Sequence, residues 1–340
     1  MSPRAKACAV LAVGVFAAAW ASILVRWGVR DAPPAPLVEA GRWLLGWLSA
    51  AGWAGAGKAP PLVIATGRMV LAALLLTPVA LGARVPRELR ALDRRGLFLV
   101  LLSGLALALH FATWISSLDM TTVASSVVLV STHPLFVGLA AHFLLRERVS
   151  RLTAAGIGLA MVGSALVGYG DFGLSGVALL GDLLALVGGV MAAAYFLLGR
   201  RLRQRLPILA YIWPVYAVAA VVLLAICLAT GQRFDGYAPE VYLMALLLAV
   251  GPQLLGHSSV NYALGQLSAV FVTVVVLGEP IGSSLLALLL LGEIPPLLAI
   301  FGGAMILGGI VLAGRGEGRR GEPAPEACSE PLGESTKRPD

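Results

Sequence analysis

Long runs of sequence without a charged residue constrain this chain most strongly. The longest are Ala7–Val25, Gly96–Leu118, Met120–Leu145, Leu152–Gly170, Leu206–Gln232 and Val241–Gly278. A bilayer core of roughly 30 Å is crossed by about 20 apolar residues of helix. Only 13% of the 340 residues are charged, whereas soluble domains have about 25%. The sequence therefore predicts an all-α polytopic membrane protein and excludes a pair of soluble domains.

Ten membrane-spanning helices fit these runs. We place them at residues 7–27, 61–83, 96–118, 121–145, 152–170, 175–198, 206–230, 241–263, 267–291 and 295–314. The run 241–278 is too long for one helix, and the turn Leu264-Gly265-Gln266 divides it. Arg26 and Trp27 end the first span as an interfacial anchor would, so we interpret it as uncleaved rather than as a signal peptide.

The basic residues are distributed unevenly between the loops. With the N-terminus in the cytoplasm, most of the 25 Lys and Arg residues fall in cytoplasmic loops and in the tail, as the positive-inside rule requires. This distribution predicts a multi-pass protein of the cell (inner) membrane with both termini cytoplasmic. It also accounts for the net charge of +7 without a nucleic-acid partner.

Two segments fall outside this pattern. Residues 31–60 contain an apolar stretch that is too short to cross the membrane and that follows Glu39 and Arg42. We expect an external insertion with an interfacial helix. Residues 315–340 are rich in Glu, Pro, Gly and Arg, so we expect a disordered cytoplasmic tail.

An internal repeat divides the chain in two. Thr121–Gly168 aligns without gaps on Leu267–Gly314 at an offset of 146 residues. The matched pairs are Pro134 with Pro280, Glu147 with Glu293, Gly156 with Gly302, Gly163 with Gly309 and Gly168 with Gly314. We therefore expect a first repeat over residues 1–170, which carries the 31–60 insertion, and a second over 171–314.

The two repeats are predicted to lie upside down relative to each other. Five spans per repeat is an odd number, so the second repeat must enter from the opposite side. The charges agree: Glu147 lies among arginines, whereas Glu293 has no basic neighbour. Inverted repeats around a site at the middle of the membrane are typical of secondary transporters.

These segments resemble a known family. The sequences STHPLFVGLAAHFLLRERVSRLTAAGIG and LGEPIGSSLLALLLLGEIPPLLAIFGG are similar to the two EamA-type repeats of the drug/metabolite transporter superfamily. Trp20-Ala21-Ser22 and the segment 181–186 also match. The resemblance covers residues 7–314 except the insertion at 31–60. It implies a ten-helix carrier of small solutes, often an exporter, with both termini inside.

Glu279 and His133 are the strongest candidates for a transport role. An ionisable side chain at mid-membrane costs about 2.5–3.5 kcal/mol on the insertion scale, so it usually faces a cavity. Both residues lie mid-span, coincide at the 146-residue offset and directly precede prolines, Pro280 and Pro134. These prolines should break both helices. We hypothesise that Glu279 binds a proton or a cationic substrate group and that His133 modulates its affinity. The alternative is two capped structural groups at kinks.

Further polar side chains line two other spans. Gln253, His257 and Asn261 recur every four residues in the eighth span, and His110 and Trp114 lie on one face of the third. Such stripes form either the wall of a lumen or hydrogen bonds between helices, worth about 0.6 kcal/mol each. We expect the lumen wall.

Two charged residues within spans are less informative. Asp182 in the sixth span needs a partner or water, and a structural hydrogen bond is as plausible as a coupling role. Arg68 lies near the outer end of the second span, where its head could reach the interface. Glycines in the fifth and tenth spans form small faces that suit close helix contact or a homodimer.

Three functions compete. A secondary carrier for a small metabolite or drug-like solute explains the repeats, the broken helices and the polar mid-membrane residues. An intramembrane enzyme acting on a lipid-linked substrate would need a nucleophile–base pair or a metal pair, and a channel would need a repeated filter-like loop. We find neither, and the four histidines and three cysteines have no metal-ligand spacing. We therefore expect a carrier without enzyme activity, cofactor or metal.

Overall fold

The computed structural model of the chain describes residues 2–29, 33–121, 126, 129–140, 143, 149–167, 176–291, 294 and 297–318. The expected tail lies outside these residues from 319 onward, although the last helix continues to Gly318. His142, Glu147 and Glu293 also lie outside them.

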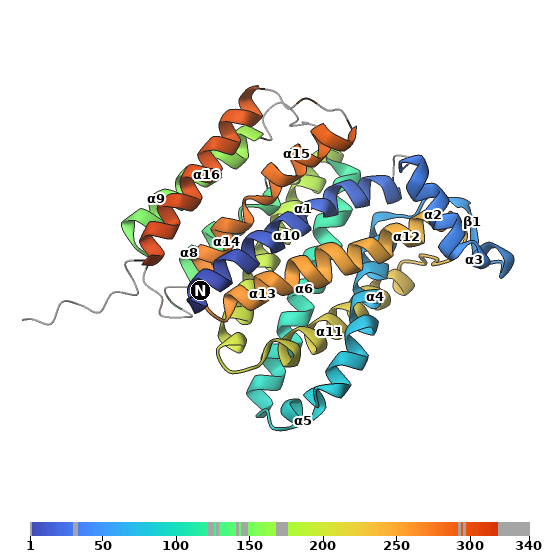
Figure 1. Cartoon of the computed structure of the whole chain (residues 1–340), viewed down its shortest axis with the longest axis horizontal. Helices are drawn as coiled ribbons and strands as arrows, with labels where there is room; N and C mark the ends of the chain where they lie inside the picture. The colour runs from blue at the N-terminus through green and yellow to red at the C-terminus, as the bar shows by residue number, and fades with distance from the viewer. Residues whose placement is uncertain are drawn as a thin grey trace, which may run out of the picture.

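The described chain is a bundle of apolar helices (Figure 1). The long unbroken helices are α1 (Pro3–Val29), α4 (Pro61–Gly82), α6 (Arg94–Met120), α9 (Arg151–Val167), α10 (Gly176–Arg203), α11 (Ile208–Ala229) and α16 (Leu297–Gly318). Two further helical segments are composite: α12 (Pro239–Leu248) continues through η2 (Ala249–His257) into α13 (Ser258–Leu264), and α14 (Ala269–Val276) is followed by α15 (Glu279–Leu291). The segment α8 (His133–Ala140) belongs to the predicted fourth span.

Seven of the described helical segments are long and apolar enough to cross a membrane, and two shorter apolar ones lie in α9 and α16. The all-α polytopic membrane fold is therefore confirmed. Helices are favoured here because every backbone polar group must be satisfied within the segment once water is absent.

Helix starts follow local signals in the sequence. Pro61 and Pro239 stand at the first turns of α4 and α12, where the missing N–H is not needed. Asp93 caps α6 by accepting a hydrogen bond of 2.8 Å from the Gly96 N–H. Ser268 caps α14 in the same way, accepting from the Phe271 N–H. These residues fix where the membrane helices begin.

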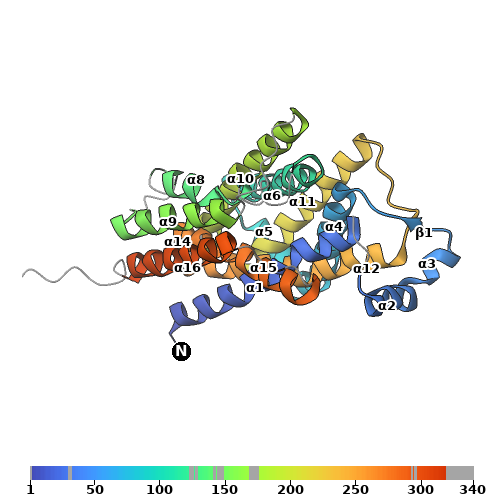
Figure 2. The ribbon, with the colours of Figure 1, turned by 90° about the horizontal axis from the view of Figure 1, so that it is seen from above.

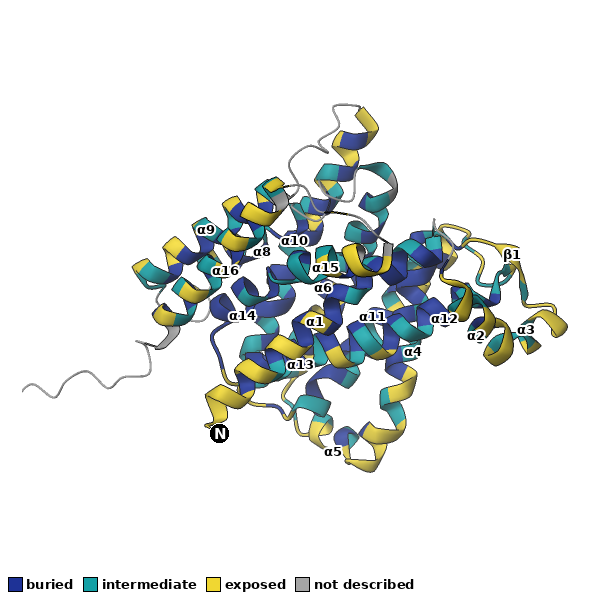
Figure 3. Ribbon diagram, turned by 45° about the horizontal axis from the view of Figure 1, so that its top comes forward, coloured by how far each residue is buried: buried dark blue, intermediate teal, exposed yellow. Residues whose placement is uncertain are grey.

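The segment between α1 and α4 contains two short helices and a short strand. These are α2 (Ala35–Leu45), α3 (Trp47–Ala50) and β1 (Ala54–Gly57). Instead of one interfacial helix, the insertion has these three elements, largely exposed in Figure 3. Backbone hydrogen bonds at Gly57 join β1 to the segment before α12, and Gly41 of α2 packs against the backbone of Glu240. The short helix α5 (Val85–Arg90) follows α4 at another end of the molecule.

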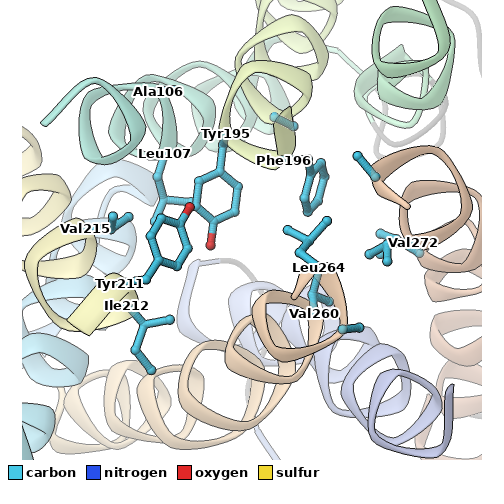
Figure 4. Packing of buried hydrophobic residues seen from close by; sticks show 14 of the residues in the cluster. Ala106, Leu107, Tyr195, Phe196, Tyr211, Ile212, Val215, Val260, Leu264 and Val272 are labelled. Carbon is cyan, nitrogen blue, oxygen red and sulfur yellow. The ribbon is translucent and has the colours of Figure 1, made fainter. Parts of the chain in front are cut away.

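The core consists of aliphatic and aromatic side chains between the inner helices. Figure 4 shows Tyr195 of α10 and Tyr211 of α11 beside Val260 and Leu264 of α13. The Tyr211 hydroxyl is 2.8 Å from the Ser103 hydroxyl, which satisfies both groups in an apolar setting. Exposed leucines cover the outer faces, as lipid contact requires.

Helices α9 and α16 form a pair at one side of the bundle (Figures 1 and 2). A Cβ added at Gly156 would lie 2.6 Å from the Gly309 carbonyl oxygen, and one at Gly163 would lie 2.5 Å from that of Gly302. Early residues of α9 thus contact late residues of α16, so the two helices are antiparallel. Gly156, Gly163, Gly302 and Gly309 are therefore used in a contact within the chain.

Candidate functional site

A small cavity lies between helices of both halves of the chain. Its volume is about 70 Å³, room for about two water molecules. Its polar wall residues are Arg68, His110, Trp114, Ser131, His133, Tyr195, His257 and Glu279. Of the candidate residues, His110, Trp114, His133, His257 and Glu279 line this cavity, whereas Asp182, Gln253 and Asn261 do not. Arg68, Ser131 and Tyr195 line it although the sequence analysis did not select them.

Two interrupted helices meet this cavity. α14 ends at Val276, and α15 begins at Glu279 after a turn closed by a 2.9 Å hydrogen bond from the Gly278 N–H to Val275. In the other half, helix resumes at His133 after a similar turn. Each new helix therefore begins at the residue before its proline, at the same repeat position.

Arg68 is placed very differently from our expectation. Rather than reaching the membrane interface, it is only 2% exposed. Its Nε donates a 2.9 Å hydrogen bond to Gln253 Oε1, and its guanidinium carbon lies 4.5 Å from the centre of the Phe111 ring. A cation over an aromatic face is held by the ring quadrupole. The side chain therefore points inward, toward α6 and η2.

Aromatic rings form much of the cavity wall. The His110 and Trp114 rings stack with their centres 5.7 Å apart, and the His133 ring lies 5.4 Å from that of Phe196. His110 Nδ1 lies 2.9 Å from the Gly188 carbonyl oxygen. Because a carbonyl oxygen only accepts, Nδ1 must carry the proton, and the orientation of this ring is fixed.

The three residues that were predicted to form one stripe on the eighth span do not all line the cavity. His257 reaches the cavity, but Gln253 and Asn261 are fully buried and are absent from its wall. Gln253 accepts from Arg68, while Asn261 Nδ2 donates 2.6 Å to the Tyr195 hydroxyl. These two positions match the alternative of hydrogen bonds between helices.

The cause of this division is the π-helical segment η2, which contains Pro252. Proline has no N–H to donate and clashes with the preceding turn, and π-helical hydrogen bonds run from i to i+5, with wider turns than in an α-helix. Gln253 and His257, which are four residues apart within η2, therefore lose the α-helical offset that defined the predicted stripe, whereas Asn261 lies beyond η2 in α13. Pro252 was the sequence signal for this change.

Asp182 lies away from the cavity wall. Its Oδ1 accepts a 2.7 Å hydrogen bond from Thr121 Oγ1, at the start of the segment that leads into the predicted fourth span. Gly181 beside it allows close contact with the backbone of Thr121. This hydrogen bond fits the structural role that the sequence analysis weighed for Asp182 against a coupling role.

Several buried polar atoms around the cavity lack a hydrogen-bond partner among the described residues. In the cavity wall they are Arg68 Nη2, Trp114 Nε1, His133 Nε2 and His257 Nδ1. Buried polar groups are satisfied in the great majority of cases, so a cluster of unsatisfied ones needs an explanation. The described part of the chain holds no group of three or more His, Cys, Asp or Glu side chains that could bind a metal ion.

Thiol labelling would test this placement. With the three native cysteines replaced by serine, His257→Cys should react with a small hydrophilic methanethiosulfonate reagent when the helices around the cavity separate, because this position lines the cavity. Gln253→Cys on the same span should react at least about tenfold more slowly, since that position is fully buried and excluded from water. Equal reactivity at both positions would instead support the undivided lumen stripe. Labelling is followed by mass spectrometry of the purified protein.

Comparisons with known proteins agree with this architecture. The model of the EamA-like transporter family matches the chain twice, over residues 44–169 and 179–315; the first match begins within the predicted insertion. The uncharacterized transporter YetK of Bacillus subtilis (strain 168) is 26% identical over 261 residues, covering 74% of this chain and 77% of YetK. One solved crystal structure shares the fold, with a TM-score of 0.68 at 18% identity, covering 93% of this chain and 99% of that one. The chain therefore belongs to the EamA-like transporter family and is a membrane transporter.

Proposed function

We propose that this protein is a secondary carrier that exports a small metabolite or drug-like solute by alternating access. The observation that carries the proposal is the cavity where two interrupted helices from different repeats meet. Glu279 and His133, the first residues after the two interruptions, both line its wall. Discontinuous helices at a site between repeats are typical of secondary transporters.

The α9–α16 pair supports an inverted relation between repeats 1–170 and 171–314. Gly156 contacts Gly309, the repeat mate of Gly163, while Gly163 contacts Gly302, the mate of Gly156. This exchange of partners is the rule for an interface built around a twofold axis. Because the helices are antiparallel, the axis runs across them, and the two repeats would cross the membrane in opposite directions.

Packing of the other helices follows the same exchange. α1 packs on η2 and α15, while α10, which takes its place in the second repeat, packs on α6 and α8. Equivalent spans also contact each other directly: α4 contacts α11, and α8 of the fourth span contacts α14 of the ninth. This pattern supports ten spans in two inverted sets of five, with the cavity near the axis.

The cavity volume bears on the transport cycle. Ligand pockets usually measure about 300–1,000 Å³, whereas this cavity holds about 70 Å³. A metabolite could enter only after the helices around it separate. We therefore assign this conformation to an occluded step, which opens to one side of the membrane by movement of one repeat against the other.

Counterflow in proteoliposomes tests the carrier function. A thermal-shift screen of the purified protein against a metabolite panel first identifies a solute that raises its stability, because a ligand of the folded state shifts unfolding. Vesicles preloaded with unlabelled solute should then take up labelled solute faster than empty vesicles. A channel would show no such acceleration, and an enzyme would convert the solute; either result would contradict the proposal.

The proposed orientation places both termini in the cytoplasm and the segment 31–60 outside. In a cysteine-free background, Lys58→Cys should be labelled by a membrane-impermeant maleimide on intact cells. Arg87→Cys in α5, an equally exposed position, should be labelled only after lysis because its basic loop is assigned to the cytoplasm. The reverse pattern would invert the orientation.

A further inference from the structure

We propose that the cavity selects solutes that carry a carboxylate group, with the Arg68 guanidinium as its anchor. This inference rests on the proposed carrier function and assigns a chemical class to the cargo. It is carried by two buried, unsatisfied donors, one cationic and one neutral, on residues that line a cavity with room for a small group.

Arg68 is the stronger donor. An arginine side chain stays protonated in proteins, and a buried charge without a partner is strongly unfavourable. Among the described residues, Nε is satisfied by Gln253, whereas Nη2 is buried without a partner and no carboxylate forms an ion pair with the guanidinium. Nη2 is therefore available to an acceptor, and a guanidinium group pairs well with the oxygens of a carboxylate.

Trp114 supplies the second donor. The indole N–H only donates, and Trp114 Nε1 is buried without an acceptor among the described residues. The ring is held by stacking on His110, whose own Nδ1 is fixed by the Gly188 carbonyl oxygen. A donor that is fixed in this way cannot turn aside to satisfy itself, so its acceptor must come from the occupant of the cavity.

Aromatic and acidic side chains next to these donors restrict what the rest of the solute can be. Phe111 covers one face of the Arg68 guanidinium, and Phe196 lies beside His133. Glu279 adds one acidic group to the same wall. A carboxylate solute is compatible with Glu279 in two ways: it brings its own ammonium group, or a proton accompanies it onto Glu279. The solute carries a carboxylate in both cases. It is a zwitterion in the first case and an anion in the second.

Binding of small probes to the purified full-length protein separates these cases. We expect L-lactate or L-alanine to raise the unfolding temperature, while lactamide and L-alaninamide, which lack the carboxylate, do not. Stabilisation by L-alanine alone indicates a zwitterion, and stabilisation by L-lactate that strengthens with acidity indicates an anion bound with a proton. Preferential stabilisation by glycerol 3-phosphate, or by the amides, would overturn the assignment.

Two variants link the selectivity to named atoms. Trp114→Phe keeps the aromatic packing and removes the N–H, so the Kd of the stabilising carboxylate should rise about 2- to 10-fold, as for one neutral hydrogen bond. Trp213→Phe is the matched control, since the Trp213 Nε1 donates to Thr77 Oγ1 outside the cavity; its Kd should not change. Arg68→Lys keeps the charge but not the planar edge, and should raise the Kd by about tenfold or more.

Folding and function must be separated in this test. If Arg68→Lys fails to fold, the Trp114→Phe and Trp213→Phe pair still decides the assignment: equal affinities in both would refute it. Counterflow of the stabilising probe is measured in parallel. Carboxylate-selective binding without counterflow would contradict the carrier function alone. Counterflow of an uncharged solute at a rate that neither donor variant changes would contradict the carboxylate assignment alone.

Discussion

Glu279→Gln is expected to abolish uphill transport driven by a proton gradient while leaving the protein folded. The glutamine side chain has the shape of the carboxyl group and keeps its hydrogen-bonding capacity, but it cannot bind or release a proton. Glu279 is the first residue of α15 and lines the cavity, so it is placed to exchange a proton when the cavity opens. Flux of the solute identified by counterflow, measured in proteoliposomes with an imposed pH gradient, gives the result.

The competing explanation for Glu279 is structural. An acidic residue in the first turn of a helix contributes about 0.3–1 kcal/mol through the helix dipole, and Glu279 occupies such a position. Glu240 also lies in the first turn of its helix, as the second residue of α12, but does not line the cavity, so Glu240→Gln is the matched control. A purely structural role predicts similar small losses of stability in both variants and normal uphill flux in both. Uphill flux of Glu279→Gln at the wild-type rate would end the coupling hypothesis.

Much of the fold could be predicted because a membrane leaves few options for an apolar segment. The predicted second span, 61–83, corresponds to α4 (Pro61–Gly82), and the seventh, 206–230, to α11 (Ile208–Ala229). Proline supplied the finer detail: Pro134 and Pro280 were expected to break their helices, and α8 and α15 begin one residue before them. These features depend on local sequence, so one sequence suffices.

The orientation of side chains around the cavity could not be predicted in the same way. The sequence gives the depth of Arg68 in α4 but not its direction, which depends on Phe111 and Gln253, residues far away along the chain. A guanidinium near the end of a span can reach the interface equally well. Gln253 was predicted to share one stripe with His257 because the α-helical period was assumed through η2, where Pro252 changes the hydrogen bonding. Asn261 lies beyond η2 in α13, where it donates to the Tyr195 hydroxyl.

The insertion at residues 31–60 shows a third reason why the structure differs from the prediction. Its sequence predicted one interfacial helix, but the structure contains two short helices and a strand whose partner is the segment around Tyr237. That partner lies about 180 residues away along the chain. Long-range pairing of this kind leaves no periodic signal in either segment, whereas the amphipathic helix α2 does.

The close contact between α9 and α16 leads to the second prediction of a large effect, here on the stability of the protein. Gly156→Ala combined with Gly163→Ala should separate these helices and strongly destabilise the protein. The new Cβ atoms would lie 2.6 Å and 2.5 Å from backbone carbonyl oxygens of α16, which cannot move aside as a flexible side chain could. Overpacking costs typically about 1–3 kcal/mol at each site, and more where backbone is the neighbour. The unfolding midpoint of the purified protein in detergent measures the loss.

Gly158→Ala in the same helix is the control for this pair. Among the described residues nothing lies within 4 Å of a Cβ at position 158, so the substitution meets no obstacle. Alanine is favoured over glycine in a helix interior by about 1 kcal/mol, and Gly158→Ala should therefore leave stability unchanged or raise it. The same chemical change thus has opposite signs on two faces of α9. If the double variant were as stable as Gly158→Ala, then α9 and α16 would not be in backbone contact, and the antiparallel pair that supports the inverted repeats would be lost with it.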